Sequence, residues 1–405
     1  MAEEDAVTTS PLTNRFDDAS FYLDDPHRVY AALRREDPVH WYADGPFWVI
    51  TKYDDIRFIS KHPELFSSAE IAILGDIIKD RDGVPGPPRD TILFRDPPEH
   101  LEHRKVLNHQ LTPARVNAIE SDVQAVVADV CAALPGDEFE AIHCLAEPLP
   151  VNVFSRLLGV PRDDWQRVIW WSTVITNSGG GMETPETMAA TYAELIPYLE
   201  ALIAERKDAP RDDLLTVITQ ATVHGEPLTP LEVVWWAITL LAAGSETTQS
   251  LIAGMLWAMT QHPDQGAELL ADPELVPGAV EETLRWWTPV NSMARRATTD
   301  VELRDKTIRR GDNVLLVYGS ANRDEEEWGD DADRWDIRRE NAKGHLAFGF
   351  AEHFCMGAHL ARREVRLLVE ELGRRAGGIE LAGEPIRRRS TLATTFDRLP
   401  IRLVP

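Results

Sequence analysis

The chain has 405 residues, with 42 Lys and Arg against 67 Asp and Glu, and therefore a formal net charge of −25. Such an acidic chain is poorly suited to nucleic acid or an anionic membrane, because both attract basic side chains. The three cysteines are too few for a disulfide framework, the first residues lack a signal-peptide pattern, and no apolar run reaches the length of a membrane span. Composition therefore predicts a cytoplasmic protein with no nucleic-acid partner and no membrane span.

The N-terminal part of the chain predicts few regular elements. Residues 1 to about 20 are acidic and polar, which is typical of a loosely held arm. Segments 39–42 and 47–50 flank a Gly-Pro turn and predict a β-hairpin. Segments 79–95 and 176–187 are rich in Gly and polar residues. Each loop is interpreted either as a lid or binding loop or as a tolerated surface insertion.

The clearest predicted element is a long helix from Thr229 to about His262. Thr229, Pro230 and Glu232 suit the N-cap, the first helical position and the third position of a capping box, and Pro263 would end the helix. The first half is apolar around most of its circumference, which predicts that it is buried.

Further strand-like segments lie toward the C-terminus, at 314–318, 379–381, 391–396 and 401–404. Helical segments dominate, and no regular alternation of strand and helix runs along the chain. The sequence therefore predicts a mainly α fold with a minor β component. Because no linker or internal repeat divides it, residues 21–405 are expected to form a single domain.

The strongest chemical signal is the segment HLAFGFAEHFCMGAHLARRE, at 345–364. Cys355 lies in an apolar loop directly before a helical sequence, where unpaired N–H groups and the helix dipole favour the thiolate that binds metal. Phe348 and Phe354 would shield the sulfur, and Gly349 and Gly357 would allow close approach of the backbone. A lone cysteine is more often a small core residue, but this spacing favours a ligand.

The segment resembles the haem loop of the cytochrome P-450 family, F-G-x-G-x-H-x-C-x-G. It departs from that pattern at Ala351, where glycine is usual, and at Met356, where leucine is commoner. The resemblance implies the cytochrome P-450 fold, in which a long central helix lies over the haem and small sheets lie at the periphery. It also implies that Cys355 is the metal ligand of haem b, and thiolate donation favours O–O cleavage.

A second motif lies in the long helix. Ala243, Gly244, Glu246 and Thr247 match the family's A-G-x-[DE]-T segment. The resemblance implies that Ala243 and Gly244 lie against the haem, that Thr247 hydrogen-bonds oxygen on the iron, and that Glu246 relays protons. A mid-helix threonine hydroxyl can also bond to the carbonyl one turn earlier and open a kink. A simple polar stripe is the alternative interpretation.

Two further resemblances concern charged residues. Glu282 and Arg285 match the family's E-x-x-R, which implies a buried structural pair joined by a third arginine, either Arg334 or Arg338. The resemblance also implies cationic partners for the haem propionates: His100, Arg104, Arg295 (with Arg296 as a competing assignment) and His353. A zinc site at His100, His103 and His109 is a weak alternative, since no further ligand has a suitable spacing.

Electrons must come from outside the chain, because no G-x-G-x-x-G dinucleotide motif is present. The helix after Cys355 carries a group of basic residues, which we interpret as a docking patch for an acidic ferredoxin-type partner or, alternatively, as an ordinary solvated face. These residues are Arg362, Arg363, Arg366, Arg374 and Arg375.

A substrate pocket is expected beside the oxygen-binding segment, and the family resemblance implies further walls at 71–93, 290–293 and 392–395. Its lining is predicted to be mostly apolar with a few polar groups, which suits a hydrophobic substrate. The predicted lining residues are Trp236, Thr239, Ala242, Val290, Asn291, Met293 and Leu392. The tryptophan can equally be a core residue.

Together these resemblances imply a monomeric haem-thiolate monooxygenase that inserts one atom of O₂ into a steroid, terpenoid or fatty acid, with electrons from a ferredoxin and its reductase. One alternative is a peroxygenase of the same fold that uses H₂O₂, although the Glu246–Thr247 pair favours O₂. Another is a non-catalytic haem sensor or carrier, which would need neither that pair nor a substrate cavity.

Overall fold

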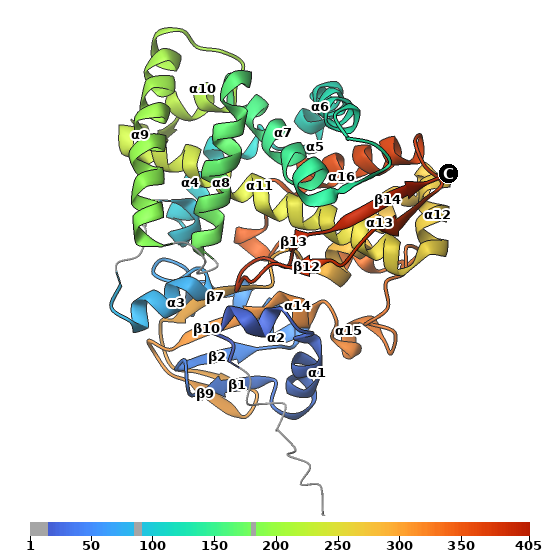
Figure 1. Ribbon diagram of the computed structural model, residues 1–405. Helices are drawn as coiled ribbons and strands as arrows, with labels where there is room; N and C mark the ends of the chain where they lie inside the picture. Colours follow the sequence, from blue (N-terminus) through green and yellow to red (C-terminus); the bar gives the residue numbers. More distant parts are fainter. Residues whose placement is uncertain (1–14, 85–90, 180–183) are drawn as a thin grey trace, which may run out of the picture.

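The computed structural model describes residues 15–84, 91–179 and 184–405, and Figure 1 shows a helical half above a smaller half that is rich in strands. The helices are α1 (His27–Glu36), α2 (Tyr53–Lys61), α3 (Leu74–Arg81), α4 (Glu99–Asn108), α5 (Pro113–Ala118), α6 (Glu120–Ala132), α7 (Pro148–Leu158), α8 (Trp165–Gly179), α9 (Pro185–Asp208), α10 (Leu214–Thr219), α11 (Pro230–Gln261), α12 (Pro263–Ala271), α13 (Val276–Trp287), α14 (Tyr318–Ala321), α15 (Glu325–Trp328) and α16 (Ala358–Gly373).

The strands form several small sheets. They are β1 (Val39–Tyr42), β2 (Phe47–Ile50), β3 (Phe66–Ser67), β4 (Glu138–Glu140), β5 (Thr222–Val223), β6 (Glu226–Pro227), β7 (Ser292–Ala297), β8 (Val301–Leu303), β9 (Lys306–Ile308), β10 (Asn313–Val317), β11 (Gly378–Leu381), β12 (Ile386–Arg387), β13 (Phe396–Arg398) and β14 (Pro400–Val404). The largest sheet has the order β1-β2-β10-β7-β3, and a second has the order β11-β14-β4.

The five-stranded sheet joins distant parts of the chain. The predicted hairpin forms, with Val39 opposite Ile50 in the antiparallel β1–β2 pair. β10 then adds to β2 in the parallel direction, and β7 pairs with β10 antiparallel. The sheet therefore fixes the segment that follows α13, which carries Arg295, against the N-terminal part of the chain.

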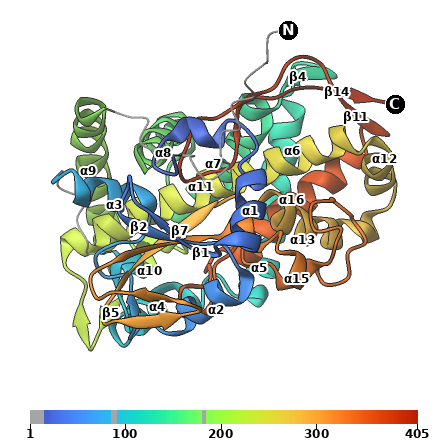
Figure 2. The same ribbon diagram turned by 90° about the horizontal axis from the view of Figure 1, so that it is seen from below.

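Helix α11 is the central element of the helical half. Its capping box forms as predicted, because the Thr229 side chain accepts the Glu232 N–H and the Glu232 carboxylate accepts the Thr229 N–H. Figure 2 shows α11 crossing the molecule, with α9 and α10 near its start and α12 near its end. Contacts with α7, α8, α13 and α16 bury most of it, as the apolar sequence predicts.

The predicted mainly α fold with a minor β component is confirmed, with four local corrections. The predicted arm ends earlier than residue 20, because Phe16 is only 2% exposed and packs edge-on against Phe21 and Tyr42; residues 1–14 of that arm lie outside the described chain. The predicted strand 391–396 is mostly irregular, and only Phe396 belongs to a strand.

The two predicted loops are also shorter than expected. Segment 79–95 begins inside α3 and contains a single turn at Ile92–Phe94, and residues 85–90 lie outside the described chain. Segment 176–187 is largely taken up by the end of α8 and the start of α9, and residues 180–183 are not described. Within the described ranges, no helix has the length and apolarity that crossing a bilayer requires. The single-domain assignment stays a prediction.

Candidate active site

The loop before α16 holds Cys355 in a tight turn. The Cys355 N–H donates to the carbonyl of Phe348 over 2.8 Å, which closes the loop. Gly349 and Ala351 both have positive φ, at 71° and 58°. Glycine adopts this conformation without strain, whereas the Cβ of alanine makes it sterically unfavourable. The loop therefore reaches its shape in spite of Ala351.

The surroundings of the Cys355 sulfur combine burial with positive charge. Backbone N–H groups of Gly357 and Ala358, at the start of α16, hydrogen-bond the sulfur, as the helix N-terminus predicts. Burial raises the pKa of the Cys355 thiol above its usual value, while these N–H groups and the guanidinium groups of Arg104 and Arg362 oppose that rise. The residue nevertheless has exposed surface. The sulfur thus lies among N–H and guanidinium groups that favour the thiolate, the form that binds metal.

Helix α11 presents the second predicted motif. The Thr247 hydroxyl donates to the Ala243 carbonyl over 2.8 Å, which is the back-bond predicted from the sequence, and the helix is continuous through this turn. Ala243 is exposed and Thr247 half-buried although the helix is central. Gly244 lies on a different side, because a Cβ there would meet the Phe154 ring at 2.5 Å. The glycine therefore allows α7 to approach α11.

Sequence reasoning missed the partner of Glu246. The buried Glu246 carboxylate lies 3.4 Å from Nη1 of Arg388, and Nε of the same guanidinium donates to Asp397 over 2.7 Å. The Asp397 side chain is 46% exposed. A chain of charged groups thus connects the acid beside Thr247 with solvent. The run of three arginines at 387–389 was the signal in the sequence that could have revealed this pair, because a buried guanidinium needs a carboxylate partner.

Two arginines and two histidines converge near the Cys355 loop. The rings of His100 and His353 are 4.2 Å apart, and His353 Nε2 lies 3.0 Å from the Ser68 hydroxyl. Burial, together with the positive charges of Arg104 and Arg295, lowers the pKa of His100 to about 4 and that of His353 to about 2. These four groups were predicted from separate stretches of sequence, and the structure brings them together.

Neither arginine of this cluster forms an ion pair with a carboxylate among the described residues. Arg104 donates to the carbonyl oxygens of Glu352 and Phe354, at 3.1 and 2.6 Å, and thereby also supports the loop. Arg295 is buried, its hydrogen bond goes to the Ala294 carbonyl, and within the described chain it makes no ion pair. Arg296, the competing assignment, instead binds Glu70 and Asp80 at the surface. This geometry favours Arg295.

These features fit the expected haem. A buried arginine without a carboxylate and a buried His100 Nδ1 without a hydrogen-bond partner are costly unless an anion completes the cluster. Propionate groups are such anions, and a thiolate at a helix N-terminus would complete the metal site. The zinc alternative has no support, because the described residues include no group of three or more metal-binding side chains.

The predicted substrate residues divide into two groups. Val290 bridges to Ala393, and the Asn291 N–H donates to the Leu392 carbonyl, so two of the predicted wall segments do meet. Thr239, Ala242, Met293 and Leu392 are half-buried.

Two of the predicted lining residues have other surroundings. The Asn291 side chain is turned toward α1, where its amide donates to the Tyr30 hydroxyl over 3.1 Å and the residue lines a small cavity with Tyr22 and His27. Trp236 is 2% exposed and packs in the main core, which corresponds to the alternative interpretation from sequence.

The E-x-x-R pair is completely buried. Nε and Nη2 of Arg285 donate to the two Glu282 oxygens at 2.7 and 2.8 Å, and the remaining donors reach carbonyl groups. The third arginine is Arg339, 3.2 Å from Glu282, and both predicted candidates are wrong. Arg334 contributes only its carbonyl oxygen. Arg338 instead binds Glu268 at the surface, because a turn closed by the Arg339 N–H and the Asp336 carbonyl directs the adjacent side chains of Arg338 and Arg339 to different sides.

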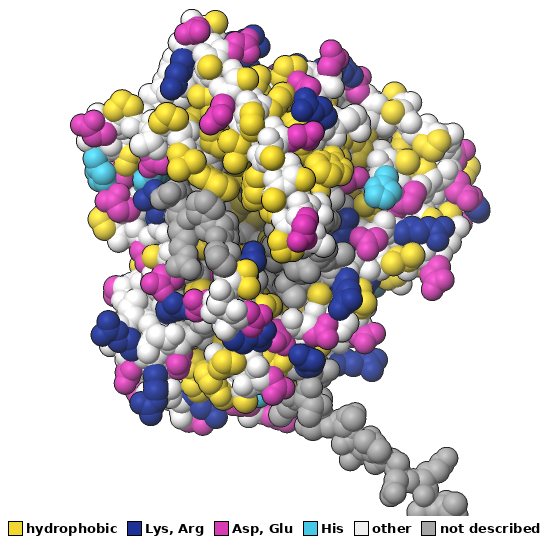
Figure 3. Space-filling view, turned by 60° about the vertical axis from the view of Figure 1, so that its left-hand side comes forward, with side chains coloured by type: hydrophobic (Ala, Val, Ile, Leu, Met, Phe, Trp, Pro, Cys, Tyr) yellow, Lys and Arg dark blue, Asp and Glu magenta, His cyan; other side chains and the backbone are white. Residues whose placement is uncertain are grey.

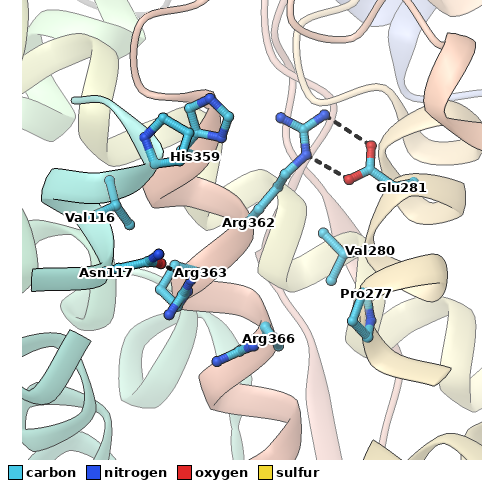
Figure 4. Close-up of a pocket in the computed structure, with 10 residues that line it drawn as sticks. Val116, Asn117, Pro277, Val280, Glu281, His359, Arg362, Arg363 and Arg366 are labelled. Carbon is cyan, nitrogen blue, oxygen red and sulfur yellow. Dashed lines mark hydrogen bonds and ion pairs between the residues drawn. The ribbon is translucent and has the colours of Figure 1, made fainter. Parts of the chain in front are cut away.

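The predicted cationic patch on α16 is largely neutralised. Glu281 binds Arg362, Glu120 binds Arg363 and Arg366, and Glu371 binds Arg374 and Arg375. Figure 4 shows the first three arginines along α16, around a surface pocket of about 210 Å³. The patch therefore presents guanidinium groups with carboxylate partners rather than free positive charge.

Comparison with known proteins agrees with these features. The Cytochrome P450 family profile matches residues 183–374. The chain is 34% identical to the vitamin D(3) 25-hydroxylase of Pseudonocardia autotrophica, over 99% of both chains. It is 32% identical to the linalool 8-monooxygenase of Pseudomonas putida, over 94% of this chain and 96% of that one. The crystal structure of CYP108D1 from Novosphingobium aromaticivorans superposes with a TM-score of 0.86, 31% identity, and coverage of 95% and 96%.

Proposed function

Since this chain belongs to the cytochrome P450 family of haem-thiolate monooxygenases, we propose that Cys355 binds the iron of haem b and that the enzyme hydroxylates or epoxidises a hydrophobic small molecule. The haem, when bound, supplies the activation of O₂. The observation that carries the proposal is the convergence of His100, Arg295 and His353 beside a loop whose cysteine receives two helix N-terminal N–H groups.

The propionate groups would be held by the cationic cluster. His100, Arg104, Arg295 and His353 provide hydrogen-bond donors for carboxylates, and an anion there would offset the positive charges of the two arginines, which lower the pKa of both histidines. On the thiolate side, Phe348 would cover the sulfur, and Gly349 and Gly357 would let the backbone lie close to the porphyrin plane.

Protons would reach the reacting oxygen through α11. The Thr247 hydroxyl is held by the Ala243 carbonyl, and its oxygen is therefore ready to accept a hydrogen bond from the exposed side of the helix. The adjacent Glu246 would pass protons toward it, and Arg388, whose guanidinium keeps its own protons, would hold the Glu246 carboxylate in a network that reaches the half-exposed Asp397. A pathway of this kind supports the use of O₂, because O–O cleavage with O₂ as the oxidant consumes protons.

The substrate is proposed to be a steroid, terpenoid or fatty acid. The half-buried residues beside α11 are mainly apolar, with Thr239 as a polar group. Figure 3 shows hydrophobic side chains gathered on the upper, helical half of one face, whereas charged side chains are denser below. Relatives named for linalool and vitamin D(3) act on small hydrophobic molecules of this kind. Screening steroids, terpenes and fatty acids for the spectral shift of the oxidised haem tests this proposal, which fails if none of them causes a shift.

The electron source separates the monooxygenase from the peroxygenase alternative. We expect product with NADPH, a ferredoxin and its reductase, and much less product with H₂O₂ alone. The reverse result would favour the peroxygenase. Binding of a hydrophobic compound without turnover under either condition would favour a haem carrier. The ferredoxin partner, the monomeric state and the cytoplasmic location stay predictions.

A further inference from the structure

Arg362 lies over an aromatic ring beside the metal-binding cysteine. Its guanidinium carbon is 4.6 Å from the centre of the Phe348 ring. Phe348 in turn accepts the Cys355 N–H through its carbonyl oxygen. The guanidinium thus packs on a residue of the Cys355 loop, where its positive charge acts on the sulfur at short range.

A buried carboxylate fixes this guanidinium in place. Glu281 accepts hydrogen bonds from Nε and Nη2 of Arg362 at 2.6 and 2.9 Å, a bidentate arrangement that Figure 4 shows. His345 Nδ1 accepts the Ala347 N–H, so Nε2 carries the proton, and this nitrogen lies 3.3 Å from the second Glu281 oxygen. Both Glu281 and His345 are buried. The carboxylate therefore links α13, α16 and the start of the Cys355 loop.

We propose that Glu281 is a positioning residue that holds the Arg362 guanidinium against Phe348, and that this fixed positive charge stabilises the reduced state of the haem–thiolate centre. The inference rests on the proposed assignment of Cys355 as the iron ligand. Reduction adds one negative charge to the centre, and a nearby cation makes that addition more favourable.

Arg366 provides a matched control on the same helix. It lies one turn after Arg362 in the same surface pocket and also binds carboxylates, those of Glu120 and Glu370. It has no contact with Phe348 among the interactions of the described residues. Arg362→Gln and Arg366→Gln each remove one positive charge from α16. Only Arg362→Gln removes a charge that packs against the Cys355 loop.

The test is a redox titration of the haem-loaded protein, followed by its absorption spectrum. At the midpoint potential of the wild type, we expect Arg362→Gln to lower the ratio of reduced to oxidised protein about tenfold, which equals about 59 mV for one electron. Arg366→Gln should change this ratio less than about twofold. Equal effects of the two substitutions would overturn the proposal. If Arg362→Gln does not take up haem, Arg362→Met, which also removes the charge, decides: a ratio below the wild-type value supports the proposal, and an unchanged ratio contradicts it.

A double-mutant cycle tests the role of Glu281. In the Glu281→Gln background, we expect Arg362→Gln to change the ratio by less than half of its logarithmic effect in the wild type, because the guanidinium is no longer held on the ring. An equal or larger effect would show that Glu281 does not position Arg362. Failure of the proposed function is recognised separately, because the wild type would then lack the thiolate-type spectrum of its reduced CO complex.

Discussion

Ala351 departs from the glycine of the related haem loops, and the structure shows what that departure costs. The residue has a φ of 58°, a left-handed conformation that costs an L-residue about 1–2 kcal/mol. The bond from the Cys355 N–H to Phe348 and the contacts of Arg104 hold the loop in this shape nevertheless. The sequence indicated an unusual residue here, but only the backbone geometry reveals the strain.

Ala351→Gly is therefore expected to stabilise the protein. The change removes the left-handed strain and adds flexibility to the unfolded chain, with a net gain of about 0.5–1 kcal/mol in the free energy of unfolding. Urea unfolding of the haem-loaded protein measures this gain. Ala361→Gly, the same substitution inside α16, should destabilise by about 0.5–1 kcal/mol. A loss of stability in Ala351→Gly would contradict the account of the loop.

The Thr247 hydroxyl is expected to determine how efficiently NADPH oxidation is coupled to product formation. Removal of its hydroxyl in Thr247→Ala should leave NADPH consumption within about threefold of the wild type and divert most of the electrons to H₂O₂, because a proton-delivery step is lost. The product formed per NADPH measures this coupling for a substrate found by spectral screening. Thr247→Ser keeps the hydroxyl and should stay largely coupled. Full coupling in Thr247→Ala would show that this hydroxyl has no such role.

At the scale of elements, helix signals were the most informative part of the sequence. The Thr229 cap, Pro230 and Pro263 located α11 to within a residue or two, because capping and proline effects are local. The irregular segment 391–396 was mistaken for a strand because its β-branched residues suit one. Its actual conformation depends on contacts with Ser250, Pro289 and Asn291, which are distant in sequence.

The ion pair between Glu282 and Arg285 on α13 is the most deeply buried ion pair described above. Glu282→Gln would leave Arg285 with a buried, uncompensated charge and is expected to cost roughly 3–5 kcal/mol. Urea unfolding and the amount of bound haem after purification measure the effect. Glu268→Gln, which breaks only the exposed pair with Arg338, should have little effect. Equal stability of the two variants would contradict the structural role of the buried pair.

At the scale of the whole molecule, the resemblance gave the fold class and the groups that line the candidate site, because these depend on short motifs. It did not give Arg388, Arg339 or the partners of the α16 arginines. Those pairings depend on where distant segments meet, and a single sequence does not contain that information. The net charge of −25 likewise concealed two arginines that gather with His100 and His353 at the candidate haem site.

Buried histidines make the stability of the whole protein sensitive to acid. Burial, aided by nearby arginines, holds the pKa of His27 well below 6.5. The unfolded chain therefore binds a proton that the folded chain does not, and stability falls as the pH drops below about 6.5. Between pH 7 and pH 5, His27→Gln should lose roughly 2 kcal/mol less than the wild type, as measured by urea unfolding. An identical pH dependence of the two proteins would show that His27 binds a proton as readily in the folded chain as in the unfolded chain.

The assignment of Cys355 as the haem ligand is the central claim, and the spectrum of the reduced, CO-bound protein tests it most directly. Thiolate ligation predicts a strongly red-shifted Soret band in the wild type and its complete loss in Cys355→Ala. Cys131→Ala, which changes a buried cysteine away from the loop, should retain the band. A wild type without the shifted band, or a Cys355→Ala variant that keeps it, would contradict the account.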